Sequence, residues 1–236
     1  MSKLNRKITL ITNAVLVVVF TAVLIVGFLP WKSVPIYGKN GITAIYNGNR
    51  EHKRVSLMFN VYENTEVVNG IIDLLNSEDV KATFFVGGCW ADDNGETLVR
   101  LNDSGHEIGN HGYFHKDHKT ISYQKNLEEI ENTDKIVFGL SGVKPTLFAP
   151  PSGSFSETTL EVAEKLGYKV IMWSKDTIDW RDKDEETLFK RATSNLENGD
   201  FVLMHPKAHT LKVLPKIIDY YKSVGFSMVT VSENLS

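Results

Sequence analysis

The sequence is poor in cysteine. Cys89 is the one cysteine in 236 residues, so the chain can form no internal disulfide and no multi-cysteine zinc site. Its neighbours in residues 84–90 are apolar, which favours a buried small side chain at this position. The fold must therefore be held by an apolar core, for which the 42% of hydrophobic residues is an ordinary supply.

The chain also lacks a basic run and an excess of positive charge. It has 26 Lys and Arg against 29 Asp and Glu, and the first thirty residues carry three cations and no acidic residue. The body that follows is therefore net acidic. This excludes the electrostatic footprint of a protein that binds nucleic acid.

One long hydrophobic run stands apart from this composition. Residues 8–30 contain no charge and, at about 1.5 Å per residue, are long enough to cross a hydrocarbon layer of about 30 Å. We interpret them as a transmembrane anchor with residues 1–7 as a cytoplasmic tail, because flanking basic residues favour the cytoplasmic side. The protein would then be a single-pass cell-membrane protein with an extracytoplasmic C-terminal domain. A cleaved signal peptide is the competing interpretation.

A spacer and one domain are expected after the anchor. Residues 31–53 mix proline and glycine with polar residues, which is typical of a spacer, although a short strand could form near 42–46. Across residues 54–236, β-type runs such as 81–87 alternate with helical segments such as 123–138. This alternation predicts an α/β fold with a parallel sheet, either doubly wound or a barrel, with its site at the carboxyl ends of the strands.

Two histidines four residues apart, His111 and His115, follow a short apolar run. If the segment turns helically, both imidazoles can converge on one ion, and neutral imidazole suits Zn²⁺, Co²⁺, Ni²⁺ or Fe²⁺. Histidines with this spacing are also common on solvated surfaces, and we expect His118 and His209 to be solvated. His111 and His115 are thus candidate metal ligands.

Polar residues follow two further strand-like runs. Asp176, Asp179 and Trp180 come after one of them, where carboxylates could orient a histidine or accept sugar hydroxyls and tryptophan offers a stacking face. A helix cap beside a buried aromatic is the alternative. His205 ends the run 200–205 and suits acid–base chemistry, with a structural histidine as the alternative.

The order of these pieces resembles the polysaccharide deacetylase family, the nodulation-type deacetylases of carbohydrate esterase family four, over almost all of residues 54–232. The matching pieces are the run KATFFVGG, His111 with His115, Asp176 with Asp179 and Trp180, and Leu203 with His205. The resemblance extends to the sporulation-associated and peptidoglycan-directed branch. It implies a deformed (β/α)7 barrel, a divalent metal such as Zn, Co or Ni, and a cell-wall glycan, peptidoglycan or chitin-like, as the partner.

The same resemblance exposes departures. The family's general-base aspartate falls on Asn60, its aspartate ligand on Val61 and its arginine on Ala149. The resemblance implies that His205 is the general acid, tuned by Asp176 or another acidic neighbour. Glu63, a few residues past the ligand position, could replace the ligand or the base, although a loop glutamate is usually solvated.

The remaining implied contacts concern the substrate. The resemblance implies substrate binding by Asn60, Pro151, Ser152, Asp179 and Trp180, with Ser152 in place of the aromatic whose backbone N–H binds the oxyanion. An amide at position 60 cannot take up a proton near neutral pH, and loss of a general base costs about 10²–10⁴-fold in rate. The sequence therefore predicts a weak or inactive metal-dependent de-N-acetylase. A silent glycan-binding module and a membrane-tethered scaffold in cell-wall or spore assembly are the alternatives.

Overall fold

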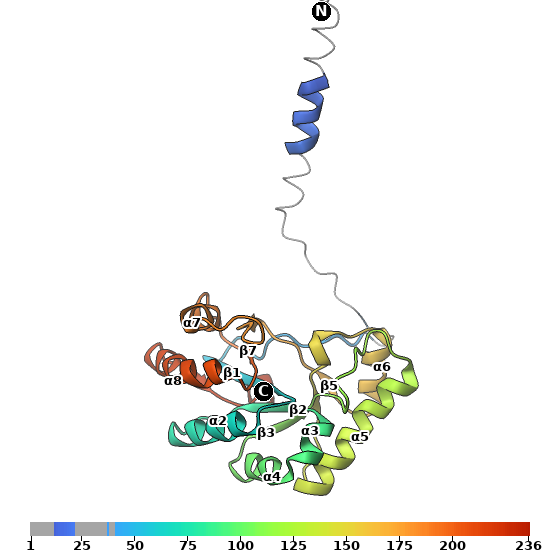
Figure 1. The fold of residues 1–236 in the computed structure, drawn as a ribbon, viewed down its shortest axis with the longest axis vertical. Helices are drawn as coiled ribbons and strands as arrows, with labels where there is room; N and C mark the ends of the chain where they lie inside the picture. Colours follow the sequence, from blue (N-terminus) through green and yellow to red (C-terminus); the bar gives the residue numbers. More distant parts are fainter. Residues whose placement is uncertain (1–11, 22–36, 38–40) are drawn as a thin grey trace, which may run out of the picture. The chain divides into compact units, whose positions relative to one another are not determined.

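The computed structural model describes residues 12–21, residue 37 and residues 41–236 (Figure 1). Residues 12–21 are helical with exposed side chains. The predicted tail at 1–7 and the rest of the predicted span 8–30 lie outside the described residues. Within the described residues, no helix combines the length and the apolar character needed to cross a membrane.

A parallel sheet forms the centre of the second unit of the chain, Ile36–Ser236. Its hydrogen-bonded order is β5-β4-β3-β2-β1-β7-β6, and β8 pairs with β1. The strands are β1 (Arg54–Val61), β2 (Thr83–Val86), β3 (Glu107–Asn110), β4 (Leu147–Phe148), β5 (Lys169–Val170), β6 (Lys175–Asp176), β7 (Asp200–Met204) and β8 (Ser227–Met228). The predicted parallel α/β fold is confirmed, as a sheet that curls into a half-barrel.

Helices connect the strands and surround the sheet (Figure 1). They are α2 (Thr65–Ser77), α3 (Gly88–Asp93), α4 (Gly95–Asp103), α5 (Tyr123–Ser141), α6 (Glu157–Lys165), α7 (Glu185–Thr193), α8 (Ala208–Ser223) and α9 (Val231–Leu235), with a 3₁₀ turn η1 (Pro151–Gly153). The start of α5 is set by Ser122, whose side chain accepts a hydrogen bond from the backbone N–H of Lys125.

Alternation along β1 divides the core into two sides. Leu57, Phe59 and Val61 belong to the larger cluster, which includes residues of α2 and α8, whereas Met58 belongs to a second cluster on the other face. Full burial of side chains of this kind contributes about 1.5–3 kcal/mol each. The same alternation puts Asn60 on the face of Met58, at the carboxyl end of the strand, and Val61 on the opposite face.

Residues 45–50, which lie within the expected spacer at 31–53, make contacts with the sheet. The Ile45 N–H donates to the Val170 carbonyl at 2.8 Å, and the Met172 N–H donates to the Ile45 carbonyl at 2.8 Å. Asn47 forms an antiparallel bridge with Asp200. The sheet thus recruits residues that lie N-terminal to the predicted boundary at 54.

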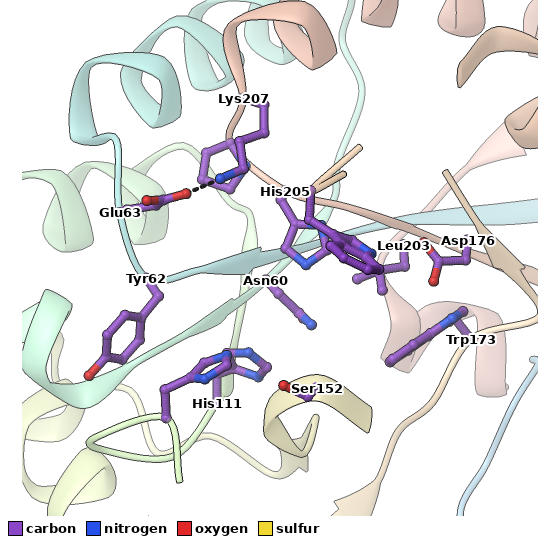
Figure 2. Close-up of a pocket in the computed structure, with 13 residues that line it drawn as sticks. Asn60, Tyr62, Glu63, His111, Ser152, Trp173, Asp176, Leu203, His205 and Lys207 are labelled. Atoms are coloured by element: carbon purple, nitrogen blue, oxygen red, sulfur yellow. Dashed lines mark hydrogen bonds and ion pairs between the residues drawn. The ribbon is translucent and has the colours of Figure 1, made fainter. Parts of the chain in front are cut away.

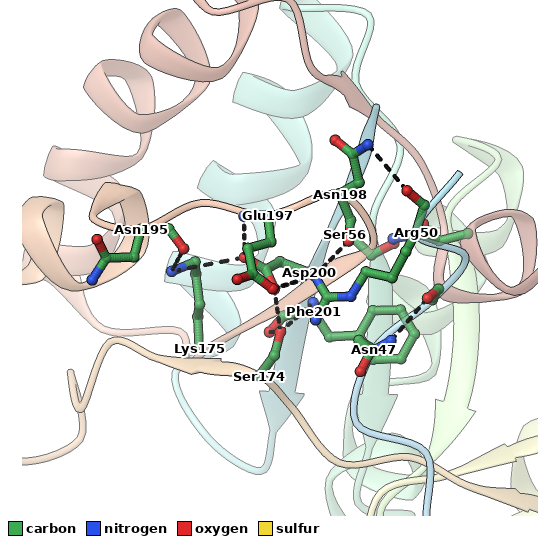
Figure 3. Close-up of polar contacts among 12 residues, drawn as sticks. Asn47, Arg50, Ser56, Ser174, Lys175, Asn195, Glu197, Asn198, Asp200 and Phe201 are labelled. Carbon is green, nitrogen blue, oxygen red and sulfur yellow. Dashed lines mark hydrogen bonds and ion pairs between the residues drawn. The ribbon is translucent and has the colours of Figure 1, made fainter. Parts of the chain in front are cut away.

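Asp200, at the start of β7, joins several segments (Figure 3). It is 3% exposed. Its Oδ1 accepts hydrogen bonds from Arg50 at 3.1 Å and from Ser174 Oγ at 2.8 Å, and its Oδ2 accepts from the backbone N–H of Glu197 at 2.9 Å. A buried carboxylate with this many donors is well compensated, so Asp200 fixes the amino end of β7 against the preceding chain.

Candidate active site

A cavity of about 660 Å³ lies at the carboxyl ends of β1, β3 and β7, where the sequence predicts the site (Figure 2). Its lining combines imidazoles, aromatic rings and few carboxylates. The lining residues are Asn60, Tyr62, Glu63, His111, His115, Ser152, Trp173, Asp176, Trp180, Leu203, His205, Pro206 and Lys207. Eight of the ten predicted site residues therefore share one cavity; Pro151 and Asp179 do not line it.

The two predicted ligand histidines do face each other. The ring centroids of His111 and His115 are 5.2 Å apart. They do so without the helical turn that was considered as a condition: the segment is a loop in which Gly112 and His115 take the left-handed backbone conformation, with φ of 71° and 53°. The backbone conformation of this loop, and not helical spacing, therefore brings the two imidazoles together.

The tautomer of His111 is set by the backbone. Its Nδ1–H donates to the Ala149 carbonyl at 2.7 Å, which leaves the Nε2 lone pair for the cavity. Burial, together with the neighbouring His115, lowers the pKa of His111 to about 3. Burial also lowers the pKa of His115. Both side chains are therefore neutral near pH 7, the form in which imidazole binds metals.

Helix α5 supports the loop that carries His111 and His115, the histidine loop. Glu129 is buried, and its Oε2 accepts hydrogen bonds from the backbone N–H groups of Tyr113 at 2.9 Å and Phe114 at 2.7 Å. His118 is also fully buried, with its Nδ1 2.7 Å from Asn126 Oδ1. The expectation that His118 is solvated is wrong, because the loop turns inward onto α5.

The metal site implied by the resemblance is incomplete. No group of three or more His, Cys, Asp or Glu side chains in the described part of the chain is arranged to hold a metal ion. Glu63, the predicted replacement ligand or base, instead forms an ion pair with Lys207 at the cavity rim (Figure 2). His111 and His115 thus supply two donors where a catalytic metal typically has three protein ligands.

Of the acidic neighbours that the sequence left open as partners of His205, the carboxylate that pairs with it is that of Asp179, not that of Asp176. His205 Nδ1 lies 2.7 Å from Asp179 Oδ1. Asp176 instead accepts the backbone N–H of Ile178 at 2.8 Å and lines the cavity. Ile178 has φ of 54°, and this left-handed turn directs the two aspartates to different places.

Asp179, which was expected to contact the substrate, is buried and does not line this cavity. It is 1% exposed, and its Oδ2 accepts hydrogen bonds from the backbone N–H of His205 at 2.7 Å and from Thr210 Oγ1 at 2.6 Å. His209, which was expected to be solvated, is half-buried, and its Nε2 donates to the Asp179 carbonyl at 2.8 Å. Asp179 is thus a buried support for two histidines.

The residues that replace the family's two aspartates and its arginine, Asn60, Val61 and Ala149, lie in different surroundings. Asn60 lines the cavity, but Val61 is fully buried in the larger core cluster, so alternation along β1 keeps its side chain away from the histidines. Ala149 is buried and contributes its carbonyl to His111. Pro151 is buried outside the cavity lining, whereas Ser152 is exposed at the rim with φ of 55°.

Three further residues of this region were not predicted from the sequence. Tyr62 follows Asn60 by two positions, its ring lies edge-on to His115 at 5.2 Å, and its hydroxyl donates to the Tyr113 carbonyl at 3.2 Å. Burial raises the pKa of Tyr62 to about 12. Lys207 follows His205 by two positions, a spacing that could have been noticed. Glu129 lies in the middle of a helix, and no local pattern separates it from Glu128.

The fold and the cavity define a class of protein: a parallel α/β hydrolase-type domain with an imidazole pair, an imidazole–carboxylate pair and aromatic walls suited to a carbohydrate. The chain belongs to the polysaccharide deacetylase family, whose sequence pattern matches residues 47–171. This confirms the resemblance drawn from the ordered motifs.

Similar proteins include deacetylases and a pseudoenzyme. The YlxY protein of Bacillus subtilis is 35% identical over 80% of this chain and 59% of YlxY. The peptidoglycan-N-acetylglucosamine deacetylase PgdA of Listeria monocytogenes is 33% identical over 78% of this chain and 39% of PgdA. This chain thus spans less than two thirds of either relative.

The solved structure of BA3943 from Bacillus anthracis, a CE4 family pseudoenzyme, matches with a TM-score of 0.80 and 34% identity, over 82% of this chain and 69% of BA3943. A BA3943 mutant with restored enzymatic activity matches with the same TM-score and 32% identity. The chain therefore resembles both active and inactive members of its family.

Proposed function

We propose that this protein is a membrane-tethered, peptidoglycan-directed member of the polysaccharide deacetylase family. Its cavity binds N-acetylated cell-wall glycan, and its metal-dependent de-N-acetylation is weak or lost. The named activity of PgdA supports the substrate class, and the likeness to BA3943 supports impaired catalysis.

One observation carries the proposal: an amide occupies the cavity position at which the family resemblance implies the general base. Asn60 can orient a water molecule but cannot take its proton. Ala149, where the resemblance implies arginine, adds no cation. The loss of both groups together is coherent, because a cation without its anionic partner is unfavourable in a partly buried site.

The acid side of the site is intact. The Nδ1–H of His205 donates to Asp179, so its Nε2 is directed to the cavity, and the protonated imidazolium could pass its Nε2 proton to a departing amine and remain as the neutral Nδ1–H form. Trp173 and Trp180 offer apolar faces for a sugar ring, and Trp180 is 56% exposed. These groups bind and orient a glycan whether or not the amide bond is cleaved.

A silent glycan-binding module and a membrane-tethered scaffold in cell-wall or spore assembly are the second candidates. The incomplete metal site favours them, because two imidazoles alone bind a divalent ion more weakly than three ligands. Binding of chitin or peptidoglycan fragments without turnover would separate the glycan-binding module from a scaffold that ignores glycans.

The proposed tether is an uncleaved span over residues 8–30 with its N-terminus in the cytoplasm. Protease added to spheroplasts should degrade the domain and spare the N-terminal tail. A mature N-terminus near residue 31, measured by mass spectrometry, would instead establish secretion after signal cleavage.

Activity is tested with the full chain in detergent micelles. Acetate release from peptidoglycan and chitin oligomers should lie about 10²–10⁴-fold below that of Listeria PgdA, with less than one divalent metal per chain by elemental analysis. Robust acetate release that Glu63→Ala leaves unchanged would refute the proposed defect.

A further inference from the structure

Asn60 is a buried amide without a protein partner. The residue is 5% exposed, and its Oδ1 is buried with no hydrogen-bond partner in the described part of the chain. Its side chain reaches from β1 into the space near His111 and Ser152 (Figure 2). A buried polar group left unsatisfied costs about 1–3 kcal/mol, which a ligand with matching groups can recover.

The surroundings of Asn60 carry no unpaired charge. His111 donates its Nδ1–H to the Ala149 carbonyl and so presents Nε2 to the cavity, and the Ala149 side chain is apolar. The carboxylate of Asp179 is engaged by His205 and Thr210, and that of Glu63 by Lys207. Position 60 is therefore an uncharged hydrogen-bonding point at the end of β1.

Asp176 is the remaining carboxylate in the lining, and it has no ion pair among the described residues. Its Oδ1 accepts the Ile178 N–H at 2.8 Å. In Figure 2 it lies beyond Leu203, near Trp173 and on the side of His205 away from Glu63. A cation at Asn60 would thus have no carboxylate directly at hand.

An acetamido group matches Asn60 better than an ammonium group does. The amide of Asn60 can present either its oxygen or its nitrogen after a half-turn of its terminal torsion. An acetamido group has both a C=O acceptor and an N–H donor, so it pairs with either orientation. An ammonium group has donors only and brings a charge whose desolvation nothing at this point offsets.

We infer that Asn60 makes the cavity a reader of acetylation state, which selects glycans with N-acetylated amino groups over the same glycans with free amines. The inference rests on the proposed function and deepens it. The asparagine that stands in place of the general base thus determines specificity, because its side-chain amide is the group that recognises the acetamido group of the glycan.

The test measures the affinity of the full chain in detergent for chitin tetramer and for the fully deacetylated tetramer by calorimetry. A chelator removes metal ions, and the pH is set so that the free amine is protonated. The unmodified protein should bind the acetylated tetramer at least about tenfold more tightly, which corresponds to about 1.4 kcal/mol. Asn60→Ala should weaken binding of the acetylated tetramer about five- to tenfold.

The decisive variant is Asn60→Asp, which keeps the shape and adds a negative charge. It should strengthen binding of the deacetylated tetramer and abolish or reverse the preference. Asn76→Asp, the same change at an exposed position of α2 outside the cavity lining, is the matched control and should leave the preference unchanged. Equal affinities in the unmodified protein, or a preference that survives Asn60→Asp, would overturn this inference alone. Absence of binding to both tetramers would refute the proposed function and the inference with it.

Discussion

His205 and Asp179 are bound to each other twice: Nδ1 of the imidazole lies 2.7 Å from Asp179 Oδ1, and the backbone N–H of His205 donates to Oδ2 at 2.7 Å. Burial alone would raise the pKa of Asp179, but the hydrogen bonds from His205 and Thr210 outweigh it and hold that pKa below its usual value. One carboxylate thus orients both the imidazole and the end of β7.

Removal of this carboxylate should destabilise the fold. Asp179→Ala leaves the His205 N–H and the Thr210 hydroxyl without their acceptor, so the free energy of unfolding should fall by about 1–3 kcal/mol. Asp179→Asn keeps one acceptor oxygen and should cost less. Denaturant unfolding measures both. Asp176→Asn is the control, and its free energy of unfolding should lie within about 0.5 kcal/mol of that of the unmodified protein. A larger loss would argue that Asp176 also supports His205, as the sequence suggested.

Glu129 should act as a positioning residue for the histidine loop. Glu129→Ala removes the acceptor of the Tyr113 and Phe114 N–H groups, so the loop should lose its fixed backbone and the glycan affinity should fall about tenfold or more. Glu129→Gln retains an acceptor oxygen and should rescue binding.

The control for Glu129 is Glu128→Ala, because Glu128 lies next to it on α5 but pairs with Lys125 at the surface. The rescue distinguishes positioning from general stability: binding that followed the melting temperature across all three variants would argue for a merely structural role.

The effect of introducing aspartate at positions 60 and 61 should depend on which face of β1 each residue occupies. Asn60→Asp places a carboxylate in the cavity and should raise the affinity for Zn²⁺ or Co²⁺. Addition of Val61→Asp puts a charge in the larger core cluster and should lower the free energy of unfolding by several kcal/mol in the absence of metal.

Addition of metal should recover stability in the double variant if the strand end rearranges so that both carboxylates reach the histidines. Further addition of Ala149→Arg supplies a cation for the new base and should raise acetate release above that of the double variant. Metal content and acetate release are the measurements, and a double variant that binds no more metal than the unmodified chain would contradict this account.

Stability should fall steeply in acid because three buried histidines resist protonation. Burial lowers the pKa of His106 to about 4, of His111 to about 3 and of His118 to about 4. The unfolded chain takes up these protons near pH 6.5, so between there and pH 4 it binds more protons than the native state. Each histidine should therefore remove roughly 1.4 kcal/mol per pH unit over this window as the pH falls. Urea unfolding at several pH values checks the slope, which should be flat above neutral pH.

Much of the fold was predictable because its signals are local. The apolar run before Asn60 and the helix expected at 123–138, found as α5, follow from hydrophobic periodicity and from the Ser122 cap. Strand β6 was not expected, because Lys175 and Asp176 have polar side chains and pair with β7 only through the backbone. Such short polar strands show no hydrophobic periodicity in the sequence.

The site was predictable to the level of strand ends and no further. His111, His115 and His205 follow strands whose ends must converge, so their grouping was expected. The choice between Asp176 and Asp179 depends on the left-handed backbone of Ile178, and the burial of His118 depends on contacts with α5. Backbone turns and long-range packing of this kind have no signature in residue spacing.

Residues 45–50 are attached to the sheet, so a force applied to the chain on their N-terminal side is transmitted to the sheet at defined residues. A pull on the chain from its N-terminal side would first load the backbone bonds of Ile45 to Val170 and Met172, and then the contacts of Arg50 with Asp200. These anchor points lie beside β5 and at the amino end of β7, whereas His205 follows the carboxyl end of β7. Tension applied to the N-terminal side of the domain would therefore be taken up first by the backbone of the sheet, and at β7 it would act on the end of the strand opposite to His205.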